Sequence, residues 1–152
     1  MAGKMTVGQC CRNKIFYFFF VFFIFNARSF AGEGGKQMEI RISGAEFEIK
    51  AELNNTATSR DLWASLPVRL RFYPLQNREF YAPIALEKED SDVRDGYEIG
   101  DIGYWTGGDT VVLYYGEGWT GDLIIMGRMT SDFDFLRTIS EPFDAVIEKI
   151  GE

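Results

Sequence analysis

Histidine is absent from this 152-residue chain, and its two cysteines, Cys10 and Cys11, stand next to each other near the N-terminus. The lack of histidine excludes a Ser–His or Cys–His nucleophile pair, an imidazole general base and a histidine-containing zinc site. Any catalysis would rest on carboxylate, lysine, tyrosine or arginine side chains. We therefore expect no bound metal and no cofactor.

Long apolar runs are confined to one place. Residues 15–25 (IFYFFFVFFIF) are unbroken in apolar character, basic residues precede them, and Ser29-Phe30-Ala31 supplies the small residues of a cleavage site. The pattern predicts a secretory signal peptide over residues 1–31 and a flexible leader over 32–37. The alternative is a retained membrane anchor, but the run is shorter than the roughly 20 residues that a spanning helix needs. Residues 38–152 then form one folded domain, exported to the periplasm or the extracellular space.

Basic residues are also scarce in the domain itself. Four of the 16 lysines and arginines, and none of the 23 acidic residues, lie in residues 1–31, which leaves a formal charge of −11 on residues 32–152. Such a surface repels phosphate backbones and anionic lipid headgroups, so neither nucleic acid nor a membrane surface is expected as a partner. Small cations, polar ligands and basic proteins are compatible with it. The sequence does not indicate an oligomeric state.

Alternation of apolar and polar residues recurs along the domain and predicts strands with one face in water. Residues 38–42 and 47–51 alternate in this way on either side of Ser43-Gly44, so they are predicted to form an antiparallel hairpin. Further strands are predicted at residues 68–73, 78–82, 101–105, 110–115, 123–129 and 143–150. Residues 110–115 are nearly all apolar, which indicates a central strand that is covered on both faces.

Two short helices are predicted between the strands. Thr58 followed by Asp61 resembles a capping box and starts the first, which Pro67 ends, and the second occupies residues 131–139. The acidic segment 83–96 lacks the spacing of a calcium loop and is predicted to be solvated. About eight strands and two short helices make a mainly β fold, either a barrel or a sandwich.

A family resemblance is carried by NNTATSRDLWASLP at residues 54–67, GDIGYW at 100–105, VVLYYG at 111–116 and the Gly-Arg pair that ends residues 124–128. Together these resemble the small bacterial cyclophilin-like domains, over roughly residues 38–150. The resemblance implies a closed cyclophilin-like β-barrel flanked by helices, in a family without an agreed activity. The isomerase signature F-H-R-x-I-x-x-F-M-x-Q-G-G-D is missing. Its nearest counterpart, RLRFYPLQ at residues 69–76, lacks the spacing, so no catalytic residue is carried over.

Aromatic residues gather around two glycine-rich loops, residues 106–109 and 116–122. Rings with polar tips at a barrel mouth can stack on a sugar, a peptide or a planar ligand. The candidate binding residues of this kind are Tyr104, Trp105, Tyr115 and Trp119. The alternative is that the rings fill the core with their polar tips at the rim, which suits the two tyrosines best. Trp119 stands in a loop between glycines and has less core to enter.

Arg71 is the basic candidate for the site. It shares a strand face with Arg69, and that face is either in solvent or, in a closed barrel, in the interior. These residues lead to the hypothesis of a non-catalytic module that binds a small molecule or a peptide at the rim near Trp105 and Trp119. A weak peptidyl-prolyl isomerase, which needs no histidine, and a structural protein-interaction domain are the alternatives.

Overall fold

The computed structural model describes residues 37–151, and the predicted signal peptide and most of the predicted leader lie outside them. The described residues form a closed barrel of eight antiparallel strands, as predicted. The strands are β1 (Met38–Ser43), β2 (Glu48–Leu53), β3 (Val68–Leu75), β4 (Glu79–Pro83), β5 (Asp101–Trp105), β6 (Thr110–Tyr114), β7 (Leu123–Met129) and β8 (Phe143–Lys149). No helix within this part of the chain has the length and apolar character to cross a bilayer.

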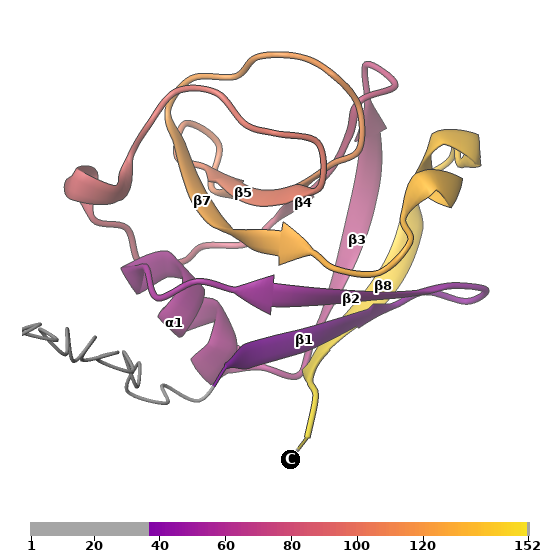
Figure 1. Ribbon diagram of the computed structural model, residues 1–152, viewed down its shortest axis with the longest axis horizontal. Coiled ribbons are helices and arrows are strands. Elements are labelled where there is room, and N and C mark those ends of the chain that lie inside the picture. Colours follow the sequence, from indigo (N-terminus) through magenta and orange to yellow (C-terminus); the bar gives the residue numbers. More distant parts are fainter. Residues whose placement is uncertain (1–36, 152) are drawn as a thin grey trace, which may run out of the picture. The chain divides into compact units, whose positions relative to one another are not determined.

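The strands are ordered β1-β2-β7-β5-β6-β4-β3-β8 around the barrel, and β8 pairs with β1 to close it. Figure 1 shows the strands wrapped around the barrel, with the helix α1 (Ala57–Ser65) next to the end of β2. The order brings β4 beside β6, although more than twenty residues separate them in sequence. This pairing positions the site described below.

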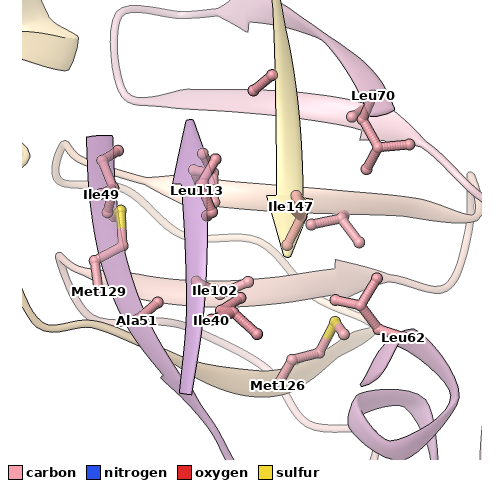
Figure 2. Packing of buried hydrophobic residues seen from close by; sticks show 14 of the residues in the cluster. Ile40, Ile49, Ala51, Leu62, Leu70, Ile102, Leu113, Met126, Met129 and Ile147 are labelled. Carbon is pink, nitrogen blue, oxygen red and sulfur yellow. The ribbon is translucent and has the colours of Figure 1, made fainter. Parts of the chain in front are cut away.

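Alternation along each strand sends one set of side chains into the barrel. Figure 2 shows these inward side chains meeting in one apolar cluster. The cluster includes Ile40, Ile49, Ala51, Leu70, Ile102, Leu113, Met126, Met129 and Ile147 from the strands and Leu62 from α1. Since most of the barrel's apolar area is removed from water here, this cluster supplies the main stabilisation of the fold.

Strand β6 is buried along its whole length, as its apolar sequence predicts. Val111 and Leu113 point into the main cluster, whereas Val112 and Tyr114 point to the outside of the barrel and join a second, smaller apolar cluster with Leu123. The barrel is therefore covered on its outer face at this strand, and the cover is built by loops rather than by a second sheet.

The helix start differs from the prediction. Thr56, not Thr58, is the N-cap of α1: its Oγ1 accepts a hydrogen bond from the backbone N–H of Ser59 at 3.2 Å. Asn54 supports this cap, because its Oδ1 accepts hydrogen bonds from Thr56 and from the Ser59 hydroxyl. Thr58 is fully buried and has no room to act as a cap. The second predicted helix is a short 3₁₀ helix, η2 (Asp134–Thr138), and another, η1 (Asp90–Asp92), lies in the acidic segment.

Strand β3 runs further than the sequence suggests. Pro74 does not turn the chain but pairs with Phe80 inside the β3–β4 ladder. The reversal comes at Gln76 and Asn77, which both adopt positive φ values, near 54° and 53°. This tight turn places Arg78 and the first residue of β4 directly beside the end of β3.

Candidate binding site

A cavity of about 580 Å³ lies on the outer face of the barrel, over β4, β5 and β6 and under the loop 116–122. We call it the outer-face cavity. It is lined by Leu75, Arg78, Glu79, Tyr81, Trp105, Thr110, Val112, Tyr114, Trp119, Thr120, Gly121 and Asp122. Its walls are mostly aromatic and aliphatic, with a few polar groups at defined places, which is the usual make-up of a small-molecule site.

Strand register explains why these side chains meet. Glu79 pairs with Tyr114, Tyr81 with Val112, and Trp105 with Thr110, and paired residues of an antiparallel ladder lie on the same face. The outward residues of three neighbouring strands therefore form one continuous floor.

Both tryptophans are held at the cavity by glycine-rich turns, because a glycine has no Cβ to collide with an indole. A Cβ on Gly107 would approach the ring of Trp105 to 2.8 Å, and Gly108 lies against the same ring. Gly121 packs in the same way against Trp119. The two indoles still keep 40% and 65% of their surfaces exposed, so each has an open side available for a ligand.

Arg78 holds the start and the middle of the loop 116–122. The Arg78 carbonyl accepts hydrogen bonds from the N–H groups of Tyr115 and Gly116, each at 2.9 Å. Its guanidinium donates to the carbonyl oxygen of Trp119 at 3.2 Å and to the Thr120 hydroxyl at 3.4 Å. Gly96 and Asp95 hold the second half of the loop, since the Gly96 N–H donates to the Thr120 carbonyl and Asp95 Oδ1 accepts from the Asp122 N–H.

Buried polar atoms without a hydrogen bond concentrate at this site. Five such side-chain atoms occur in the described residues, and four of them belong to Arg78, Glu79, Tyr97 and Tyr114. Tyr97 contacts the site through its ring, which stacks on Tyr114 with a centroid distance of 3.6 Å. Arg78 Nε lies 3.2 Å from Glu79 Oε2, close enough for charge attraction, but the N–H does not point along the line between them.

Burial shapes the electrostatics of the floor. It raises the pKa of the Glu79 carboxyl above its ordinary value, and the Arg78 charge lowers that pKa only in part. The Tyr114 hydroxyl has a pKa far above its usual range, mainly because of burial and also because of the nearby Glu79 charge. Tyr114 is therefore a neutral hydroxyl that can both donate and accept a hydrogen bond.

The predicted site residues divide into two groups. Trp105 and Trp119 line the outer-face cavity together. Tyr104 lies inside the barrel, where its hydroxyl donates to the carbonyl of Ile84 or the carboxylate of Asp109, each at 3.1 Å, and accepts from the Leu86 N–H. Because the hydroxyl of Tyr104 both donates and accepts hydrogen bonds within the protein, Tyr104 is a residue of the core and not of the cavity.

Tyr115 and Arg71 also lie away from the cavity. Tyr115 points into the barrel beside Phe80, with a ring centroid distance of 5.4 Å. Arg71 lies on the outer surface and pairs with Asp144 at 3.1 Å, both side chains being about half exposed. The structure therefore brings two of the five candidates to one site.

Arg78 and Glu79 are the residues that the sequence did not reveal. Glu79 alternates with Phe80 in an ordinary strand pattern, which indicates a solvated carboxylate, yet only 5% of its surface is exposed. What buries Glu79 is the pairing of β4 with β6, which places its carboxylate against Tyr114. Long-range strand pairing is not written in a local pattern.

A larger hollow of about 830 Å³ lies beside the β1–β2 turn and β8. Its lining includes three acidic residues and Arg69, and none of the buried polar side-chain atoms without a hydrogen bond belongs to it. The described residues also contain no group of acidic side chains placed to hold a metal ion. The outer-face cavity is therefore the stronger candidate.

A closed eight-stranded antiparallel barrel with one helix is consistent with a cyclophilin-like fold. The sequence matches the cyclophilin-like family over residues 40–148, and the chain belongs to this family. A hypothetical protein from Archaeoglobus fulgidus, known from its solution structure, is similar in fold with a TM-score of 0.65. That protein is 25% identical, and the match covers 78% of this chain and 98% of that one. No curated protein matches significantly.

Proposed function

We propose that the domain is a non-catalytic binding module that holds a small molecule, or a side chain of a peptide, in the outer-face cavity between Trp105 and Trp119. The observation that carries the proposal is the position of the exposed large hydrophobic residues. Four occur in the described residues, and three of them, Leu75, Trp105 and Trp119, line this one cavity. Scattered exposed apolar residues are ordinary, but a concave cluster marks an interaction site.

The fourth exposed residue extends the same surface. The ring of Tyr73 packs against that of Tyr81, a lining residue, with centroids 5.7 Å apart. A ligand ring that enters between the two indoles would remove apolar surface of the ring and of the indoles from water. This burial is expected to stabilise the complex by about 25 cal/mol per Å² of apolar area. The loop is already held by Arg78, so little ordering accompanies binding.

The lining lacks two of the side chains that act as nucleophiles in enzymes. No lysine and no serine lines the cavity, and the deeply buried carboxylate of Glu79 has the Arg78 guanidinium beside it.

Export remains part of the proposal and rests on residues 1–31 alone. Sequencing the N-terminus of the secreted protein tests it, and a first residue at Gly32 is the expected result.

Binding is testable with Nile red, a neutral dye whose emission rises in apolar surroundings. The folded domain is expected to bind it, and Trp119→Ala is expected to weaken the binding about tenfold, equivalent to about 1.4 kcal/mol for an aromatic anchor. Trp63→Phe is the matched control, because Trp63 packs against the main cluster under Lys149 and does not line the cavity. Absence of dye binding, or equal binding by Trp119→Ala, would refute the proposal.

A further inference from the structure

The floor of the outer-face cavity holds hydrogen-bond acceptors that nothing in the described residues satisfies. The Glu79 side chain is only 7% exposed, and its Oε2 lies 3.2 Å from Arg78 Nε without receiving a directed hydrogen bond. The hydroxyl of Tyr114, on the paired strand, likewise has no directed hydrogen bond, although Thr120 lies beside it. A buried acceptor without a directed hydrogen bond is costly, so a site of this kind is completed by a donor, from water or from a ligand.

The charge of the lining favours a cationic donor. Glu79 and Asp122 are the carboxylates of the lining, and Arg78 is its single cation. The guanidinium of Arg78 already donates to Trp119 and Thr120, which holds it toward the loop. Arg78 also lies 3.2 Å from Glu79 Oε2, but two carboxylates against one cation leave the lining with a net negative charge. The whole chain adds an attractive field with its formal charge of −7.

The aromatic walls fit a cation as well. Ring faces attract ammonium groups electrostatically, tryptophan more strongly than tyrosine. Trp105, Trp119 and Tyr81 supply three such rings around one opening. An anionic ligand would instead face two carboxylates, and a neutral ring would leave Glu79 without its donor.

We propose that the ligand of this cavity carries a protonated amine, which donates N–H bonds to Glu79 and Tyr114 while its carbon skeleton lies between Trp105 and Trp119. The inference rests on the proposed binding function and names the chemical class of the ligand. It assigns Glu79 as the specificity-determining residue and the two indoles as the source of affinity.

Three probes of one size test the inference: 2-phenylethylamine, 2-phenylethanol and 3-phenylpropanoate, each titrated by tryptophan fluorescence at pH 7. The amine is expected to bind about tenfold more tightly than the alcohol, and the acid more weakly than both. Glu79→Gln keeps the shape and removes the charge, so it is expected to abolish the preference for the amine. Asp122→Asn, which the positive φ of 58° at this position tolerates, is expected to reduce the preference two- to threefold.

Glu46→Gln is the matched control, because it makes the same charge change at an exposed residue outside the cavity. It is expected to leave the preference intact, which separates a local contact from general attraction to an acidic protein. If the alcohol binds as tightly as the amine, or if Glu79→Gln keeps the full preference, the inference is wrong. If Nile red binds but the amine is not preferred, only the ligand class fails. If Nile red does not bind, the proposed function itself fails.

Discussion

Replacing Gly127 with alanine is expected to lower the free energy of unfolding by about 3 kcal/mol, the range of severe single-site changes. Gly127 of β7 is opposite Leu53 of β2, at the junction that joins the β1–β2 hairpin to the rest of the barrel. A Cβ at this position would overlap the carbonyl oxygen of Glu52 and lie 2.8 Å from the Cα of Leu53. Both are backbone atoms, so relief requires the two strands to separate. Urea unfolding followed by circular dichroism measures the loss.

Gly108→Ala provides the comparison. Its Cβ would meet only the ring of Trp105, a partly exposed side chain that can move without disturbing the backbone. We expect a loss below about 1 kcal/mol, together with weaker Nile red binding as the indole shifts. Equal losses for the two variants would show that the close approach of β2 and β7 is not a special constraint on the barrel.

The barrel could be predicted because the pattern of apolar and polar residues within each strand indicates that strand by itself. Inward residues such as Ile40 and Ile49 alternate with charged ones, and β6 is apolar on both sides because Val112 and Tyr114 are covered from outside. The end of β3 was placed too early. The prediction ends this strand at residue 73, but the fixed φ and missing N–H of Pro74 are compatible with a place in the β3–β4 ladder.

The site was predicted only as far as its rim. Trp105 and Trp119 are conspicuous because they stand beside glycine-rich loops, and both line the cavity. The floor could not be found in the same way. Glu79 and Tyr114 are 35 positions apart and meet through the register of β4 and β6. A local sequence pattern shows that a segment forms a strand, but it does not show which strand lies beside it. A carboxylate that a neighbouring strand buries therefore looks the same in the sequence as a solvated one.

Removing the guanidinium of Arg78 is expected to destabilise the domain in a way that depends on pH. In Arg78→Ala the Glu79 carboxylate is buried without its cation, which costs about 2 kcal/mol at pH 7, below the 3–5 kcal/mol of a completely buried pair because Arg78 is partly exposed. Burial already raises the pKa of Glu79 in the folded protein, and Arg78 opposes that rise. The variant therefore has a still higher folded pKa.

The sign of the pH dependence follows from this shift. A carboxyl whose folded pKa exceeds its unfolded value, about 4.3, contributes its stability fully below that value. The contribution is lost as the pH rises through the folded pKa. Urea titrations of Arg78→Ala at pH 4 and pH 7 should thus show a small deficit relative to wild type at pH 4 and the full deficit at pH 7. The double variant Arg78→Ala/Glu79→Gln should recover most of the loss at pH 7, because no charge is then buried. A deficit that is the same at both pH values, and unchanged in the double variant, would mean that Arg78 acts only by holding the loop through Trp119 and Thr120.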